Sequence, residues 1–360
     1  MAESPFATVL EQEEAKRLLT AALQEGPAHA YLFHGARGVG KRRTAFAFAA
    51  ALLGDAARVE HRSHPDLYVL EPLGDQIRID AIRTLRRDLH MRPFEGDRRV
   101  YLVLGADLMN EEAADALLKD LEEPPSYAVM VLVADELGPL PDTIRSRCQL
   151  VPFRRLSRRA VQGFVSERKP DLPDRELAAV VRMAGGRLDR ASRLLDPDAA
   201  AQREALIELA RSVYLAERFD PRAATQVVVD LGAAAGVRAR EQIGEAAEGE
   251  TARELEQRTR RAVRGAEREE IVESLEFLAG WYRDLLAAGA GASDAALNAD
   301  HVAELAQDAE RIGLDPAGRA VEAVAETRRR FDLNVYAPLA LEALFVVLRR
   351  ELIRATAPVA

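Results

Sequence analysis

A glycine-rich octapeptide at residues 35–42 carries the strongest chemical signal in the sequence. It reads Gly-Ala-Arg-Gly-Val-Gly-Lys-Arg and therefore matches the phosphate-loop pattern G-x-x-x-x-G-K. Its glycines, Gly35, Gly38 and Gly40, would let backbone N–H groups turn toward a phosphate, and the start of a following helix would add positive potential. Lys41 would reach the terminal phosphates. The pattern predicts a phosphate-binding loop between a strand and a helix.

The oxygen ligands that such a loop gives to magnesium are missing from the sequence. Arg42 stands where Ser or Thr would supply a hydroxyl. Leu104 and Gly105 stand where an acidic pair would hold the metal, and we expect Asp107, which follows them, to point elsewhere. We therefore expect negligible ATP hydrolysis and no required cofactor. Two interpretations of residues 35–42 stay open: a vestigial loop that keeps its shape, or a loop that binds ATP or ADP without hydrolysis.

Charge and composition argue against several other classes of protein. The formal net charge is −9, so the chain alone is not expected to bind DNA tightly, because phosphate contact needs a basic surface. The single cysteine, Cys148, rules out an internal disulfide and a multi-cysteine metal site. No apolar run approaches the length of about 18 residues that a membrane span needs. The first residues also lack a secretory signal pattern, so we expect a cytoplasmic protein that does not enter the membrane.

Strand and helix patterns alternate through the first part of the chain. Short apolar runs predict strands, and apolar residues at helical spacing predict helices between them. The predicted strands are residues 30–33, 67–70, 100–104, 129–134 and 149–153, and the predicted helices are residues 44–53, 78–90 and 111–123. This alternation predicts an α/β fold in which a mostly parallel sheet is covered by helices on both faces. From residue 157 onward the pattern is almost entirely helical.

Six short motifs occur in the order found in the AAA+ subunits of bacterial clamp loaders. They are residues 6–12 (FATVLEQ), 29–35 (HAYLFHG), 63–67 (SHPDL), 79–83 (IDAIR), 110–125 (NEEAADALLKDLEEPP) and 143–148 (TIRSRC). The chain thus resembles the delta-prime subunits of bacterial DNA polymerase III over roughly residues 6–195, and more weakly over its C-terminal helices. The motifs are specific because so many of them occur together and in the family's order.

This resemblance implies three domains and a site that acts on another subunit. The implied domains are an AAA+ P-loop domain at residues 1–155, a small helical lid at 156–205, and an all-α collar at 206–360 that joins five subunits in a ring. The Ser-Arg-Cys motif implies that Arg147 is an arginine finger for a neighbouring ATP site. The implied partners are the gamma/tau ATPase subunits, the delta subunit, the sliding clamp and primed DNA. An ordinary surface arginine is the alternative for Arg147.

The sequence also departs from the pattern of this family. Many relatives carry a four-cysteine zinc module before the Ser-His-Pro-Asp segment, but residues 54–62 contain no cysteine. His61 and His64 alone cannot form a tetrahedral structural site, so we expect no zinc. In this family the position after the fourth strand, called the first sensor, is often Thr, Ser or Asn, and we interpret it here as Ala134. We interpret the position of the family's second sensor as Asp189. Both departures favour a subunit that does not hydrolyse ATP.

Two other functions remain as alternatives from the sequence. An active gamma/tau-type clamp-loader ATPase would need the metal-binding acids that Leu104 and Gly105 replace. An unrelated P-loop enzyme, such as a nucleotide kinase, would leave the motifs at residues 110–125 and 143–148 unexplained. Residues 250–270 mix both charge signs densely, and we interpret them as a solvated helical face or a flexible connection without chemistry.

Overall fold

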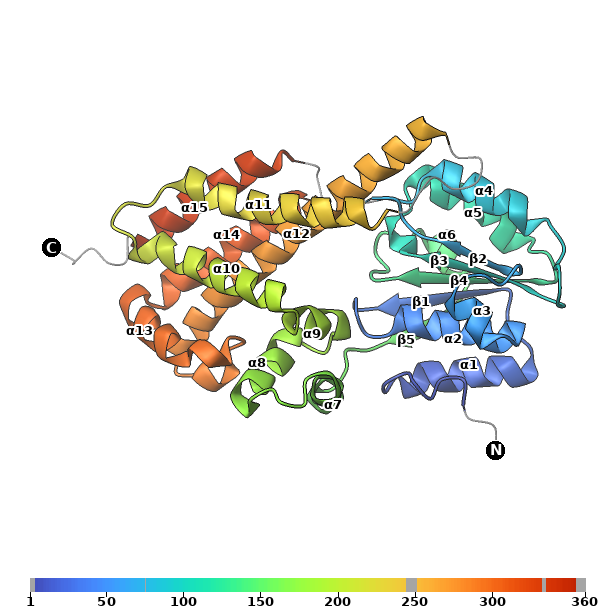
Figure 1. The fold of residues 1–360 in the computed structure, drawn as a ribbon, viewed down its shortest axis with the longest axis horizontal. Coiled ribbons are helices and arrows are strands. Elements are labelled where there is room, and N and C mark those ends of the chain that lie inside the picture. The colour runs from blue at the N-terminus through green and yellow to red at the C-terminus, as the bar shows by residue number, and fades with distance from the viewer. Residues whose placement is uncertain (1–3, 75, 244–250, 332–334, 354–360) are drawn as a thin grey trace. The chain divides into compact units, whose positions relative to one another are not determined.

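The computed structural model divides into two compact units (Figure 1). It describes residues 4–74, 76–243, 251–331 and 335–353. The first unit comprises residues 1–164 with residues 185–190, and the second comprises residues 165–184 with residues 191–360. None of the described helices is both long enough and apolar enough to cross a membrane. The three domain boundaries implied by the family resemblance stay a prediction.

A parallel sheet forms the centre of the first unit. In the described part of the chain its strands are β1 (Ala30–Gly35), β2 (Leu67–Leu70), β3 (Arg99–Leu104), β4 (Ala128–Ala134) and β5 (Gln149–Phe153), in the order β2-β3-β4-β1-β5. All neighbouring strands are parallel, and Leu32 of β1 lies opposite Leu132 of β4. β3 and β4 are buried along their whole length, which accounts for their continuously apolar sequences. Each strand lies within two residues of its predicted position.

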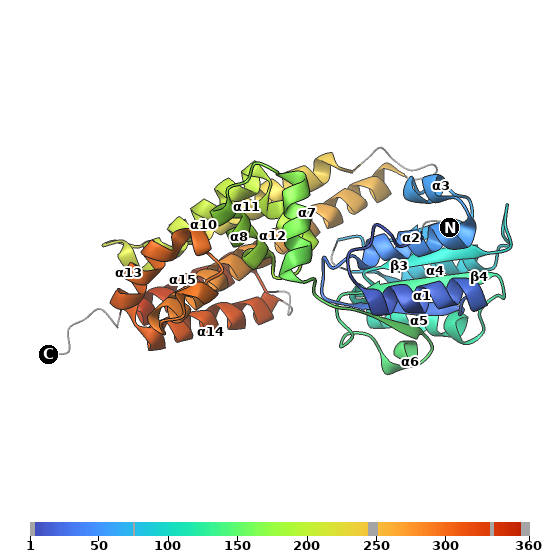
Figure 2. The same ribbon diagram turned by 90° about the horizontal axis from the view of Figure 1, so that it is seen from below.

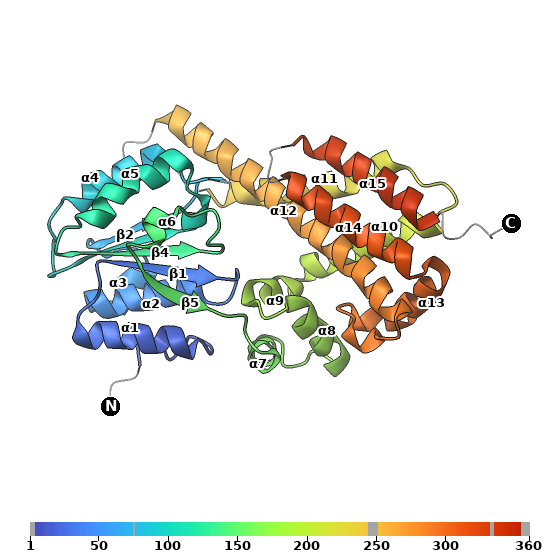
Figure 3. The ribbon, with the colours of Figure 1, turned by 180° about the vertical axis from the view of Figure 1, so that it is seen from behind.

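Helices cover both faces of this sheet (Figure 1, Figure 3). The helices on one face are α1 (Glu13–Glu25), α2 (Lys41–Leu53) and α3 (Ala56–Glu60), and those on the other face are α4 (Ile79–Leu89), α5 (Glu111–Glu122) and α6 (Asp142–Arg145). Leu19 and Phe48 belong to the apolar core of the first face, whereas Ile82 and Leu117 belong to the core of the second. The predicted α/β fold is therefore confirmed.

The described part of the second unit is helical. Its helices are α8 (Asp174–Ala184), α10 (Pro197–Leu215), α11 (Pro221–Glu241), α12 (Ala252–Gly289), α13 (Val302–Ile312), α14 (Leu314–Phe331) and α15 (Ala337–Ile353), with short turns η2 (Ser293–Ala295) and η3 (Ala299–His301). α7 (Arg158–Arg168) and α9 (Leu188–Leu194) contribute residues to both units. Figure 2 shows α14 and α15 side by side. The charged residues after 251 form the beginning of α12 and so belong to a helix.

A polar chain inside the second unit fixes three of these helices. Trp281 of α12 donates its indole N–H to the hydroxyl of Tyr214 on α10, at 3.0 Å. The Tyr214 hydroxyl donates in turn to a carboxylate oxygen of Asp308 on α13, at 2.8 Å. Arg211 also donates to that carboxylate, at 2.8 Å. Because all four side chains find partners, their burial in an apolar core is compatible with a stable fold.

Candidate functional site

The glycine-rich loop at residues 35–42 joins β1 to α2, as predicted. Gly35, Gly38 and Gly40 have φ values of 135°, 71° and 103°, a region that residues with a Cβ rarely adopt. A Cβ at Gly35 would also come within 2.0 Å of the Phe153 carbonyl oxygen on β5. Gly40 is the N-cap of α2, so the helix N-terminus opens directly onto the loop. The loop therefore has the backbone features of an anion-binding site.

Lys41 is almost fully buried in this loop, with 4% of its surface exposed. Its amine donates to the carbonyl oxygens of Gly35 and Ala36, at 2.5 and 2.7 Å. It also forms an ion pair with Asp135, at 2.7 Å. An ammonium group has three donors, and these three acceptors match them in number.

Asp135 was missed by the sequence analysis, which took Ala134 as the position after the fourth strand. β4 ends at Ala134, so the first residue beyond the strand is Asp135, and it carries a carboxylate. The prediction for this position was therefore wrong by one residue. The strand predicted at residues 129–134 already ended at Ala134, so the position that follows it was assigned one residue too early.

Arg42 is directed to an ion pair at the end of β2. Its guanidinium lies 2.6 Å from a carboxylate oxygen of Glu71, which also pairs with Arg62 at 2.8 Å. Both arginines lie over the ring of Phe46, at 5.8 and 5.6 Å from its centroid. At the position where a working phosphate loop would place a magnesium-binding hydroxyl, Arg42 thus packs on Phe46 and pairs with Glu71.

The end of β3 likewise offers no metal ligand at the two expected positions. Leu104 is buried, and Gly105 has a φ of 71° at the start of the short turn η1 (Ala106–Leu108). Asp107 in that turn accepts a hydrogen bond from the Glu136 N–H at 3.2 Å, so its carboxylate faces the residues that follow β4. Burial, with a contribution from the charge of Asp135, raises the pKa of Asp107.

These donors do not fit a magnesium–triphosphate complex. Lys41 is already paired with Asp135, and Leu104 and Gly105 offer no side-chain oxygen at the end of β3. Arg42 brings a positive charge where the metal would need an oxygen. The expectation that Asp107 points away from a metal position stays a prediction, and its carboxylate accepts a hydrogen bond from the residue two positions after β4.

Asp189 also meets the phosphate loop. A Cβ built on Gly38 would come within 1.7 Å of an Asp189 carboxylate oxygen, so this carboxylate lies directly against Gly38. The neighbouring Leu188 N–H donates to the Gly38 carbonyl oxygen at 2.7 Å. Burial would raise the pKa of Asp189, but hydrogen bonds and charge from Arg187, together with the charge of Arg37, hold it below its usual range. The carboxylate is therefore ionised at neutral pH.

Arg147 lies in the turn between α6 and β5, with one third of its side chain exposed. One guanidinium nitrogen donates to the Thr143 carbonyl oxygen at 2.8 Å, and another pairs with Glu122 at 2.5 Å. Glu122 is the last residue of α5, so the motifs at residues 110–125 and 143–148 meet through this ion pair. Cys148 packs in the apolar core beside it, and burial raises the pKa of its thiol to about 12. The thiol is therefore a packing group and not a nucleophile.

The Ser-His-Pro-Asp segment has a structural role in the first unit. His64 is buried and accepts a hydrogen bond on Nδ1 from the Asp66 N–H, at 3.1 Å. Asp66 is fully buried and accepts hydrogen bonds from the backbone N–H groups of residues 94–96, at 2.6, 3.0 and 3.3 Å. The histidine and the carboxylate thus tie the end of this segment to the loop that precedes β3.

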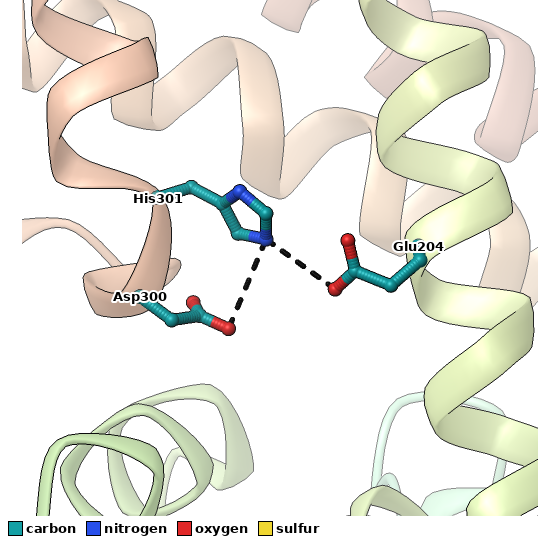
Figure 4. A group of neighbouring side chains, drawn as sticks. All are labelled: Glu204, Asp300 and His301. Carbon is teal, nitrogen blue, oxygen red and sulfur yellow. Dashed lines mark hydrogen bonds and ion pairs between the residues drawn. The ribbon is translucent and has the colours of Figure 1, made fainter.

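A group of Glu204, Asp300 and His301 in the second unit has the residue types of a metal site (Figure 4). Both oxygens of Asp300, however, accept hydrogen bonds from Arg203, at 2.7 and 2.8 Å. Arg203 also donates to Glu204 at 3.0 Å. A buried guanidinium already balances the carboxylates of this group, so its chemistry is that of an ion-pair network that fixes η3 to α10.

Comparison with known proteins agrees with the motifs of the first unit. Residues 11–157 match the family model described as DNA polymerase III, delta subunit. The chain is 36% identical over 152 residues to the DNA polymerase III subunit delta' of Bacillus subtilis. This alignment covers 39% of this chain and 46% of that protein. It is 34% identical over 198 residues to the DNA polymerase III subunit delta' of Pseudomonas aeruginosa. That alignment covers 50% of this chain and 60% of the relative.

Over residues 11–157 the chain is therefore similar to DNA polymerase III delta and delta-prime subunits. It spans about half the length of the two curated delta-prime relatives named above. A tau subunit of Bacillus subtilis is also similar, at 32% identity over 208 residues, which covers 53% of this chain and 37% of that protein. Among solved structures, a gamma subunit-related protein of Thermotoga maritima aligns over 94% of this chain and 99% of its own length, with a TM-score of 0.48 and 17% identity.

Proposed function

We propose that this chain is a delta-prime-type clamp-loader subunit that does not hydrolyse ATP and donates Arg147 to the ATP site of a neighbouring gamma/tau-type subunit. The observation that carries the proposal is a contrast between two sites of the first unit. Its own phosphate loop has an arginine in place of the magnesium-binding hydroxyl, whereas Arg147 is partly exposed in a motif typical of arginine fingers. In the complex the subunit would help to load the sliding clamp onto primed DNA during replication in the cytoplasm.

The guanidinium group of Arg147 suits this role physically. It is always charged, and its planar set of N–H donors matches two phosphate oxygens. Its position is restrained by the Thr143 carbonyl oxygen and by Glu122, so little side-chain entropy is left to lose on binding. An arginine finger supplied by a neighbour is worth about 10³- to 10⁵-fold in the rate of ATP hydrolysis.

Assembly with other subunits is supported by an apolar stripe on α15 and the residues just before it. Its members recur at helical spacing on the solvent side: Tyr336, Leu339, Ala343 and Val346. Tyr336, Leu339 and Val346 expose 74%, 67% and 51% of their surface, which is unusual for a series of large side chains on one helix face. We propose that this stripe contacts another subunit in a five-membered helical collar that contains gamma/tau and delta subunits.

An active gamma/tau-type ATPase is the alternative function, and the similarity to a tau subunit favours it. Asp107 and Asp135 do place carboxylates near the end of β4. An active site would still need the magnesium-binding hydroxyl that Arg42 replaces and the acidic pair that Leu104 and Gly105 replace. ATP turnover by the isolated chain would support this alternative.

The proposal is tested by reconstitution of the full chain with gamma/tau and delta subunits, sliding clamp and primed DNA. The measurement is the rate at which clamps are loaded onto the DNA. We expect the Arg147→Ala complex to assemble but to lose most of the loading rate that the wild-type chain provides. Arg145→Ala is the matched control, because Arg145 lies two residues away, is similarly exposed and pairs with Asp142. Normal loading by the Arg147→Ala complex would remove the finger assignment.

A further inference from the structure

Two carboxylates of the first unit reach the phosphate loop from outside its own sequence. Asp135 follows β4 and pairs with Lys41 at 2.7 Å. Asp189 lies at the start of α9, and its carboxylate lies against Gly38. Lys41, which would attract a phosphate, is therefore already paired with a carboxylate, and a second carboxylate lies against Gly38, two residues before the N-cap of α2.

We propose that Asp135 and Asp189 act as internal anions that keep phosphate groups, and hence ATP and ADP, out of this phosphate loop. This inference goes beyond the proposed function, which concerns the nucleotide of a neighbouring subunit. Of the two interpretations of residues 35–42, it favours a loop that keeps its shape without binding a nucleotide.

Asp189 is held in place by several contacts. Arg187 donates to both of its carboxylate oxygens, at 3.2 and 2.9 Å, and Arg37 of the loop lies 3.5 Å from one of them. The Leu188 N–H donates to the Gly38 carbonyl oxygen at 2.7 Å, which fixes the backbone next to Asp189. A carboxylate restrained at so many points cannot swing aside without losing these bonds, and this makes it an effective barrier to a second anion.

Asp135 acts at Lys41, the loop residue with which α2 begins. The Lys41 amine is buried and meets two loop carbonyl oxygens in addition to Asp135. A phosphate could reach this amine only by displacing the Asp135 carboxylate or by approaching close to it. Since like charges at a few ångströms repel strongly in a partly buried site, both routes weaken binding of a phosphate.

The test measures binding of ADP and of inorganic pyrophosphate to the full-length chain by calorimetry, with and without magnesium. The variants are Asp189→Asn, which removes the charge, Asp189→Ala, which also removes bulk, and each combined with Asp135→Asn. We expect no saturable binding to the wild-type chain, and binding at least about tenfold stronger for the double variants. Adding Lys41→Ala to the better double variant should abolish the gain, because the lysine would supply the attraction.

Glu13→Gln is the control for loss of one negative charge, because Glu13 is 82% exposed and pairs with Lys16 on its own helix. It should bind like the wild-type chain. Thermal unfolding of every variant identifies those that are folded. Tight binding by the wild-type chain, or folded double variants that bind no better than it does, would overturn the proposal. Either result would leave the assignment of Arg147 untouched, because that assignment is tested by clamp loading.

Discussion

At the residue scale, the two key cations of the first unit stand in opposite environments. Lys41 is 4% exposed and is matched by three acceptors, whereas Arg147 keeps one third of its side chain open to solvent. A cation that must act on another molecule has to be accessible, so Arg147 can serve a partner and Lys41 cannot without rearrangement. Their partners do not differ in this way, since Asp135 and Glu122 are 44% and 49% exposed.

Loss of the Glu122 partner should have a small effect compared with loss of Arg147 itself. An exposed ion pair contributes about 0–1 kcal/mol, so Glu122→Gln should change ATP turnover of the reconstituted complex by less than about tenfold. Arg147→Ala should lower it far more. The comparison is made by steady-state ATPase assays on complexes that contain each variant. Equal losses from both substitutions would mean that the ion pair, and not the guanidinium, matters.

Cys148 should be unreactive in the native chain. Burial raises the pKa of its thiol to about 12, so the thiolate fraction at pH 8 is lower than in the unfolded chain, where the pKa is about 8.5. We expect reaction with a disulfide reagent such as DTNB to be at least about 100-fold slower in buffer than in 6 M guanidinium, with the rate followed by absorbance. A native rate equal to the unfolded rate would contradict the burial of this side chain.

At the element scale, the loop before β3 depends on one buried carboxylate. Asp66 accepts hydrogen bonds from the backbone N–H groups of residues 94–96. Asp66→Ala would leave these groups unpaired, so we expect the free energy of unfolding to fall by about 2–4 kcal/mol, measured by urea denaturation. Asp80→Ala is the control, because Asp80 is 87% exposed and should change stability by less than about 0.5 kcal/mol.

The same carboxylate predicts a pH dependence. Burial would raise the pKa of Asp66, but its backbone hydrogen bonds outweigh burial and hold the pKa below its usual range. A lowered native pKa means that the carboxylate stabilises the fold above the unfolded pKa of about 3.9 and that this contribution is lost as the pH falls through the native value. The difference in unfolding free energy between wild type and Asp66→Ala should therefore be full at pH 7 and should shrink in acid. A difference that grows in acid would contradict this assignment.

The elements of the first unit could be predicted from the sequence because their signals are local. Apolar runs located all five described strands to within two residues, and Asn110 caps α5 as its position suggested. α2 begins at Lys41, three residues before the predicted start, because Gly40 in a left-handed conformation is its N-cap and residues 41–43 carry no apolar periodicity. The roles of Asp135 and Asp189 could not be predicted, since they depend on loops distant in sequence that meet at residues 38–41.

At the scale of the whole molecule, the apolar stripe on α15 should govern assembly and not folding. Leu339→Glu combined with Val346→Glu places charges on exposed positions, so the isolated chain should keep its helical content and its unfolding temperature. The same charges should weaken assembly with gamma/tau and delta subunits by tenfold or more, measured by analytical ultracentrifugation, because a buried charge without a partner is costly.

The matched control is Leu215→Glu, which changes an exposed leucine at the end of α10 and lies outside the stripe. It should leave assembly unchanged. Loss of assembly in both variants would indicate a general effect of added charge. Normal assembly of the α15 variant would mean that another surface of the second unit contacts the partners.

The proposed function requires that this chain supplies a catalytic cation to another subunit and hydrolyses no ATP itself. ATP turnover measures it most directly, first with the isolated full-length chain and magnesium, and then with gamma/tau subunits, delta, sliding clamp and primed DNA. We expect no turnover above background from the chain alone, stimulation of the partners by the wild-type chain, and loss of most of that stimulation with Arg147→Ala. Magnesium-dependent turnover by the isolated chain, or full stimulation by the Arg147→Ala variant, would contradict the account.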